Sequence, residues 1–356
     1  MKSQDRHGRV EYLDWMRAAA TVLVIVGHTN GFMAPGGAIG VSIFFVLSGY
    51  LIASLLLREG MLTPGNIVKF ILRRIARIYP MYALQISVVV TIFWLRWPEH
   101  MQIIISVVPG LLTFTPAPNT PWTGFSFGVL WTLAVEFWFY VTFPVVLWAA
   151  MRIGLLPCLI GGIAASIIGK ISHIDSITLA YYDHFLIGAI VATLAAQRRI
   201  PTPAASTSCR NAALAVIAIC AAVPVTARDF AWHSQSLLTA IATGTLIAHW
   251  IARPPRASMK LLQGLGVVSY SAYLTHAVAL DYIMKTTGER PDNIPLFLAI
   301  TFAASTATYL CIERPFISMA QRRLTFSRRP EAIRAGALAG DGGRGRPQEA
   351  TDPTAT

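Results

Sequence analysis

Hydrophobic and polar positions alternate in long blocks along nearly the whole chain. A helix of about 20 apolar residues crosses a hydrocarbon core of about 30 Å, and apolar runs near this length recur between short polar segments. We therefore expect an all-α fold, a polytopic membrane helical bundle of about ten transmembrane helices. The predicted spans are residues 13–32, 38–57, 79–97, 129–150, 154–170, 181–197, 211–227, 236–252, 262–284 and 295–315.

A further apolar stretch, residues 102–115, is too short for a confident crossing and contains Pro109 and Gly110. We expect an interfacial or re-entrant segment there. The first run is no cleavable signal sequence, because it carries Asp14, Arg17 and His28 and lacks a small-residue cleavage pattern.

The composition agrees with a membrane protein and excludes an ordinary soluble domain. The chain is 54% hydrophobic and 13% charged, whereas soluble domains are about 25% charged. Its net charge of +12 fits the Lys and Arg excess of cytoplasmic loops, so we expect no nucleic-acid partner. The four cysteines show neither CxxC nor Cys/His ligand spacing, so we expect no disulfide framework and no metal site.

The distribution of Lys and Arg predicts the topology. With both termini cytoplasmic, most of these residues lie on inner segments, as the positive-inside rule requires. The outer side then holds Arg96, Lys170, Arg228, Lys285 and Arg290. We expect a cytoplasmic segment 1–12, a membrane domain 13–315 and a basic, disordered cytoplasmic tail 316–356 without a second soluble domain.

Ionisable side chains inside a span are costly, by about 3 kcal/mol on insertion scales, so each is a functional candidate. In the first span, Arg17 and His28 are eleven positions apart and lie on one helical face, about 16 Å apart along the axis. Asp14 precedes Arg17 by three positions and can pair with it. The alternative is a snorkelling Arg17 and a hydrogen-bonded packing histidine.

Two later spans carry further polar candidates. Glu136 is flanked by bulky apolar residues, a setting suited to proton transfer or to orienting a histidine. Ser269, Tyr273 and His276 form one polar stripe, spaced i, i+4 and i+7. The alternatives are a structural partner for Glu136 and plain interhelical hydrogen bonding for the stripe.

A basic helical segment precedes the third span. Lys69, Arg73 and Arg77 recur every four residues, with Arg74 beside them. We expect one face of a short interfacial helix to present these cations. Such a face suits anionic lipid headgroups or a polyphosphate ligand, whose oxygens Arg binds in bidentate fashion.

Together these segments resemble the acyltransferase-3 family of membrane O-acyltransferases, the bacterial polysaccharide O-acetylase type, from Leu13 to Pro315. The matching motifs, in family order, are LDWMR followed by ten residues and His28, FFVLSGY at 44–50, RRIARIYP at 73–80, WTLAVE at 131–136 and SYSAYLTH at 269–276. One departure is that many members follow the glutamate with a second glutamate and a glutamine, where this chain has Phe137 and Trp138.

The resemblance implies transfer of an acyl group, most consistent with acetyl, from cytoplasmic acyl-CoA to a carbohydrate hydroxyl. It maps an essential Arg and His pair onto Arg17 and His28, and donor-binding basic residues onto Arg74 and Arg77. We add Arg73 to the donor site. We expect acyl-CoA as donor substrate, no tightly bound cofactor, and a location in the bacterial inner (cytoplasmic) membrane among its lipids.

The mechanistic hypothesis has His28 as general base on the acceptor hydroxyl. Arg17 would position the donor or stabilise negative charge, and Glu136 would orient His28 or shuttle protons. Direct acylation of His28 stays open. The expected acceptor is a surface polysaccharide such as exopolysaccharide or lipopolysaccharide, or a lipid-linked or glycolipid precursor. The rivals are a transporter or flippase of lipid-linked sugars and a non-catalytic scaffold, neither of which needs a CoA site.

Overall fold

A computed structural model describes residues 11–29, 36–58, 61–115, 125–171, 181–223, 230–255 and 258–326 of the chain. Every secondary-structure element within these ranges is a helix, so the all-α prediction is confirmed for them. Most of the expected N-terminal segment, the tail from residue 327 and Arg228 lie outside the described residues.

The helices follow one another with short connections. They are α1 Glu11–Thr29, α2 Gly36–Leu56, α3 Pro64–Arg96, η1 Pro98–His100, α4 Met101–Leu112, α5 Phe125–Gly128, α6 Trp131–Ile153, α7 Leu155–Ile171, α8 Tyr182–Ala196, η3 Thr202–Ala205, α9 Thr207–Ala222, α10 Phe230–Ala252, α11 Lys260–Val267, α12 Ser269–Thr287, α13 Ile294–Thr308, η4 Tyr309–Glu313 and α14 Arg314–Arg323.

Among the described residues, four helical segments are both long and apolar enough to cross a membrane, not about ten. They are Gly36–Leu56, Pro64–Arg96, Ser126–Ile153 and Ile294–Arg323. Helices α1 and α12, of 19 residues each, have the length, but their polar site residues lower the mean hydropathy. Apolar stretches in α7, α8 and α9 are shorter, at 10–17 residues. The chain is thus a multi-pass membrane protein whose remaining helices depend on their neighbours for burial.

Two expected boundaries are wrong. The basic segment at residues 69–77 is no separate interfacial helix, because α3 runs unbroken for 33 residues and contains Pro80. The last span continues through the π-turn η4 into α14, ending at Arg323, so residues 316–323 are helical rather than tail. The π-turn lies directly before Pro315, which lacks the N–H that a regular helix would use there.

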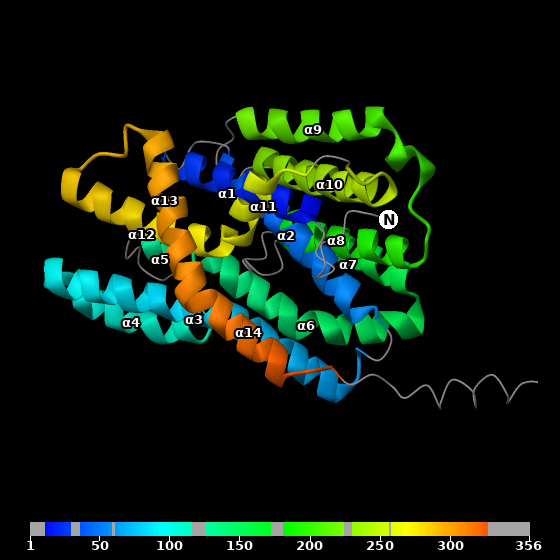
Figure 1. Ribbon diagram of the computed structural model, residues 1–356. Helices are drawn as coiled ribbons and strands as arrows, with labels where there is room; N and C mark the ends of the chain where they lie inside the picture. The colour runs from blue at the N-terminus through cyan, green and yellow to red at the C-terminus, as the bar shows by residue number, and fades with distance from the viewer. Residues whose placement is uncertain are drawn as a thin grey trace, which may run out of the picture.

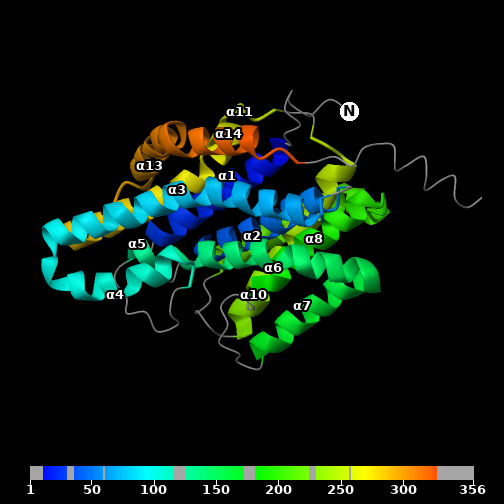
Figure 2. The same ribbon diagram turned by 90° about the horizontal axis from the view of Figure 1, so that it is seen from below.

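Helix α1 lies inside the bundle, in contact with α2, α11, α12 and α13. Figure 1 shows α9 and α10 stacked at one side, and α14 lying along α3 at another. In Figure 2, turned by 90°, α3 is the long helix, and α4 runs back alongside it. The site residues of α1 are therefore surrounded by other helices.

Close packing of α1 and α2 depends on glycine. A Cβ at Gly40 of α2 would lie 2.4 Å from the backbone oxygen of Ala20. Further along α2, a Cβ at Gly49 would lie 2.0 Å from the backbone oxygen of Phe185 in α8. Small residues at these two positions let α2 approach both neighbours, which is the common way in which membrane helices pack.

Candidate active site

Two histidines from distant parts of the chain meet at the centre of the site. Nδ1 of His28, near the end of α1, lies 3.1 Å from Nε2 of His276 in α12. Their rings are stacked, with centroids 5.3 Å apart and an interplanar angle of 11°. His276 is fully buried. The structure thus joins two predicted candidates, and it is His276 rather than Glu136 that holds the ring of His28.

The backbone of α12 decides which nitrogens of this pair carry protons. Nδ1 of His276 lies 3.2 Å from the carbonyl oxygen of Ala272, and because a carbonyl only accepts, this nitrogen is the donor. For the neutral ring, Nε2 of His276 is then the acceptor, so Nδ1 of His28 donates to it. Nε2 of His28 is consequently the basic nitrogen of the pair.

A glycine lies beside that basic nitrogen. A Cβ at Gly37, in the first turn of α2, would lie 3.6 Å from Nε2 of His28. Arg290, on the connection from α12 to α13, donates to the backbone oxygen of His28 at 2.7 Å. A cation at the carboxyl end of a helix is favourable, so Arg290 fixes the end of α1 against the α12–α13 connection.

We expect Gly37→Ala to remain folded but to lose most of its activity. The added methyl makes an ordinary van der Waals contact yet occupies the space next to Nε2 of His28, where a reacting group must come. Gly40→Ala is the matched control, since its methyl would meet the backbone of α1 at 2.4 Å and should prevent correct packing. Size-exclusion profiles and turnover of both variants test this. A fully active Gly37→Ala would contradict the placement.

Arg17 occupies the other end of α1, as its spacing from His28 predicts. Its guanidinium donates to Asp14 at 3.0 Å, which confirms the expected pair. The side chain of Asp14 is 1% exposed and that of Arg17 is 16% exposed. Arg17 lies about 16 Å from His28 along the helix axis, so its side chain does not reach the ring of His28.

Glu136 of α6 lies in a second polar centre. Its Oε1 accepts from Ser48 of α2 at 2.6 Å and from the hydroxyl of Tyr140. Arg74 lies with this group, its guanidinium carbon 5.5 Å from the ring centroid of Tyr140. Arg77 interacts electrostatically with Glu136 and with Glu313. Arg74 and Arg77 are therefore turned towards carboxylates inside the bundle.

Arg73 faces a different way from its neighbours. Its guanidinium stacks 4.0 Å from the ring of Phe326 and donates to the backbone oxygen of Gln321. The predicted stripe of Lys69, Arg73 and Arg77 therefore does not present one uniform face. Helix α14 instead supplies Arg322 and Arg323 close to α3, both exposed. Arg322 and Arg323 were not predicted as donor-binding residues, because residues 316–356 were expected to form a disordered tail.

The rest of the predicted polar stripe has structural partners. The hydroxyl of Tyr273 contacts the backbone oxygen of Val129 and the hydroxyl of Thr132, both at 2.9 Å. Ser269 is buried at the start of α12. Ser271 lies off the stripe and donates to Glu313 at 2.9 Å. Of the stripe, Tyr273 therefore holds α12 against the start of α6.

The sequence analysis missed a buried polar network around α8. His184 lies 2.8 Å from Asp183 through Nδ1 and 2.7 Å from Ser236 of α10 through Nε2. The hydroxyl of Ser236 also lies 2.9 Å from that of Ser42 in α2. All four are buried. Adjacent Asp and His in an apolar run are the sequence signal, and the network links three helices behind the site.

The helical bundle thus holds a part-buried His28 against a fully buried His276, and a separate polar centre of guanidinium and carboxylate groups, an arrangement suited to proton transfer. The sequence profile of the Acyl_transf_3 family, described as an acyltransferase domain, matches residues 10–313. The chain belongs to this acyltransferase family.

Curated relatives agree with the family. Peptidoglycan O-acetyltransferase OatA of Listeria monocytogenes is 28% identical over 88% of this chain, and YrhL of Bacillus subtilis is 26% identical over 91%. The chain covers only 57% of the length of each of these two relatives. O-acetyltransferase OatA of Staphylococcus aureus is 34% identical over 38% of this chain and 24% of its own length. No solved structure is significantly similar.

Proposed function

We propose that this acyltransferase moves an acetyl group from acetyl-CoA to a hydroxyl of a glycan, with Nε2 of His28 as general base. The observation that carries the proposal is the hydrogen-bond chain from the backbone of Ala272 through His276 to His28. The names of the relatives favour peptidoglycan or a related sugar polymer as acceptor. Both termini in the cytoplasm and residence in the bacterial inner membrane belong to the same proposal.

The reaction uses the basic nitrogen of the pair directly. The acceptor hydroxyl gives its proton to Nε2 of His28 while its oxygen attacks the thioester carbonyl. The tetrahedral intermediate then expels the CoA sulfur, which takes the proton back from His28. His276 keeps the ring in the Nδ1–H form throughout. Arg290, which already contacts the backbone of His28, is placed to support the developing negative charge.

The donor would enter from the end of α3 where the cations gather. CoA is polyanionic, and Arg73, Arg322 and Arg323 offer phosphate-binding groups there. Arg74 and Arg77 contribute from inside, next to Glu136. Arg17 would guide the long pantetheine arm, because it lies about 16 Å from His28 along α1. Glu136 then has the role of balancing the arginines, and no step requires the second glutamate that Phe137 replaces.

The proposal is tested by asking whether His276 positions the ring of His28 for catalysis. We expect His276→Phe to lower kcat about tenfold to a hundredfold with little change in KM for acetyl-CoA, because phenylalanine keeps a ring at this position but the ring of His28 loses the acceptor that fixes its tautomer. Tyr273→Phe is the control, since it removes a hydroxyl from the same helix without touching the pair. Both are measured as purified proteins in nanodiscs with acetyl-CoA and oligosaccharide acceptors.

Equal activity of His276→Phe and Tyr273→Phe would overturn the proposed base. A change confined to KM would show instead that His276 contributes to ligand binding.

A further inference from the structure

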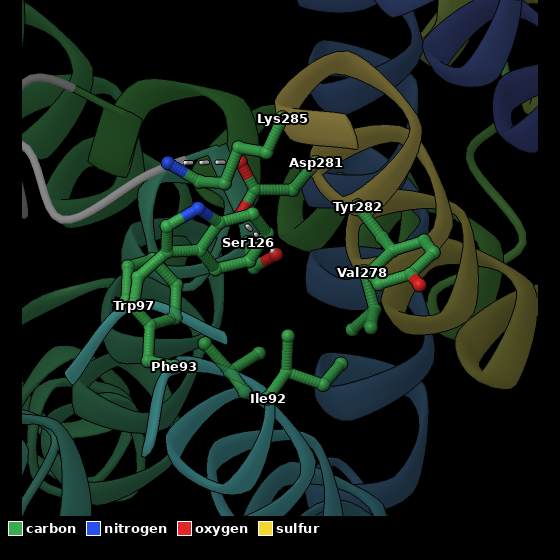
Figure 3. A pocket seen from close by; sticks show the side chains of 9 residues that line it. Ile92, Phe93, Trp97, Ser126, Val278, Asp281, Tyr282 and Lys285 are labelled. Atoms are coloured by element: carbon green, nitrogen blue, oxygen red, sulfur yellow. Dashed lines mark hydrogen bonds and ion pairs between the residues drawn. The ribbon is translucent and has the colours of Figure 1, made fainter. Parts of the chain in front are cut away.

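A buried carboxylate in α8 has a histidine as its partner. The buried Asp281 of α12 shows the more common arrangement, with a hydroxyl from Ser126 and a cation from Lys285 (Figure 3). Asp183 of α8 instead lies 2.8 Å from Nδ1 of His184, and the side chains of both residues are 0% exposed. Buried ionisable groups in a membrane protein are costly, so a pair that the acetyl transfer does not use is a functional candidate.

A chain of hydrogen bonds leads from this pair to α2. The hydroxyl of Ser42 in α2 lies 3.0 Å from the carbonyl oxygen of Ala38 and 2.9 Å from the hydroxyl of Ser236 in α10. Because a carbonyl only accepts, Ser42 donates to Ala38 and accepts from Ser236. Ser236 in turn accepts from Nε2 of His184, which is 2.7 Å away. We call Asp183, His184, Ser236 and Ser42 the α2 anchor, because these four side chains tie α2 to α8 and α10.

The direction of these hydrogen bonds excludes Ser236 as a second nucleophile. In a catalytic Ser-His-Asp triad the serine donates to the histidine, which takes up its proton. In the α2 anchor Nε2 of His184 is the donor, and the proton at Nδ1 is shared with Asp183. The four side chains are also buried, with at most 4% exposure, so they offer no open face to a substrate. The α2 anchor therefore holds helices in place and does no chemistry of its own.

The helix that it holds also shapes the space beside His28. A Cβ at Gly37, in the first turn of α2, would lie 3.6 Å from Nε2 of His28. Ser42 is five residues beyond Gly37, which is about 140° round the helix. The two residues therefore face different neighbours, with α1 on the side of Gly37 and α10 on the side of Ser42.

Helices α1 and α2 are in direct backbone contact. A Cβ at Gly27 of α1 would lie 2.3 Å from the backbone nitrogen of Gly37, and a Cβ at Gly36 would lie 3.0 Å from the carbonyl oxygen of Leu23. No side chain lies between the two backbones at these points, and close-packed groups transmit a displacement rather than absorb it. A shift of α2 therefore changes the space beside Nε2 of His28.

We propose that the α2 anchor positions the first turn of α2 against α1 and thereby limits the access of water to Nε2 of His28. The inference rests on the proposed function, in which water competes with the glycan hydroxyl for the thioester and gives acetate and the CoA thiol. The anchor residues are positioning residues, because they act through α2. Loss of one typical hydrogen bond raises the population of displaced positions of α2 about fivefold to tenfold.

The test compares two buried hydroxyls of α10. Ser236→Ala interrupts the α2 anchor. Thr239→Val is the matched control, because the hydroxyl of Thr239 donates to the carbonyl oxygen of Gln235 within its own helix. Full-length protein in nanodiscs receives acetyl-CoA with a panel of oligosaccharides of N-acetylglucosamine, glucose and mannose. We expect Ser236→Ala to release CoA thiol without ester about fivefold to tenfold faster than the wild type, and Thr239→Val to match the wild type.

A second readout needs no acetyl transfer. Diethyl pyrocarbonate modifies the basic nitrogen of a histidine, and mass spectrometry measures the label on each histidine separately. His100 is the internal reference in every sample, because 52% of its side chain is exposed. We expect the label on His28, relative to that on His100, to form about fivefold to tenfold faster in Ser236→Ala than in Thr239→Val.

Equal labelling of His28 and equal hydrolysis in the two variants would overturn the positioning role and leave the proposed function intact. If Ser236→Ala gives no monodisperse protein, Ser42→Ala decides in its place, since it removes only the hydroxyl on α2. Loss of both variants beside an intact Thr239→Val would also overturn the proposal, because the anchor would then serve folding alone. Faster labelling of His28 supports the anchor even where the wild type transfers no acetyl group, so failure of the two proposals is distinguishable.

Discussion

Arg77→Ala is expected to be the most destabilising single substitution in the polar centre. Arg77 interacts electrostatically with Glu313, Glu136 and Asp14, and Glu313 is 1% exposed. Removing the guanidinium takes away a positive charge that interacts with the buried carboxylate of Glu313. Leaving a buried charged group with fewer partners costs about 1–3 kcal/mol, which is a large share of the stability of any fold.

This loss of stability is measured by heating the protein in detergent and recording the fraction that stays monodisperse at each temperature. Arg73→Ala is the matched control on the same helix, because Arg73 stacks on Phe326, which follows α14, and not on a buried carboxylate. The double variant Arg77→Met with Glu313→Gln should recover part of the loss, since it removes both charges together. An Arg77→Ala protein as stable as Arg73→Ala would show that the buried carboxylates do not depend on Arg77.

His28→Gln is expected to remain folded and to lower acetyl transfer by about 10²–10⁴. A glutamine amide can still donate to Nε2 of His276, so the contact between α1 and α12 is kept. It cannot take up a proton from the acceptor hydroxyl. The measurement is kcat for acetyl transfer in nanodiscs, with CoA affinity as the control that should not change.

The same variant separates direct transfer from an acyl-histidine intermediate. Radiolabelled acetyl-CoA without acceptor would leave label on the wild-type protein, and none on His28→Gln, only if His28 itself is acylated. If His28→Gln transfers acetyl within a few-fold of wild type, the basic nitrogen lies elsewhere and the proposed mechanism is wrong.

The local sequence pattern predicts which residues belong to the site better than it predicts which of them contact one another. The spacing of Asp14, Arg17 and His28 on one helix is a property of the helix itself, and the Asp14–Arg17 pair follows from it. The contact between His28 and His276 joins residues 248 positions apart. Its existence depends on how α1 and α12 lie side by side, which periodicity within one helix does not determine.

The basic residues show the same limit. A four-residue repeat predicts that Arg73 and Arg77 share one helical face, but the structure gives them different neighbours. Arg77 lies with the carboxylates of α6 and η4, and Arg73 lies against α14. The third span was expected to begin at residue 79 and the last to end at residue 315. The helices instead run from Pro64 through Pro80 and on beyond Pro315, because the surrounding helices stabilise a backbone that proline alone would interrupt.

Among the described residues, fewer helices than predicted can cross a membrane by themselves, for a related reason. Apolar runs predict where helices form, and helices do occupy the predicted ranges within the described residues. Several of these helices are too short or too polar to cross a membrane by themselves. The polarity of α1 and α12 comes from the residues that build the site, so function and membrane insertion compete in the same two helices.

The most direct test of the account is acetyl transfer by the wild-type protein in sealed proteoliposomes. Acetyl-CoA is supplied to one side with the oligosaccharide panel, and free CoA thiol and sugar O-acetyl ester are measured together. The account predicts one ester for each thiol released, in a reaction that requires His28. Movement of lipid-linked sugar across the bilayer with neither thiol nor ester formed would contradict it and identify a transporter instead.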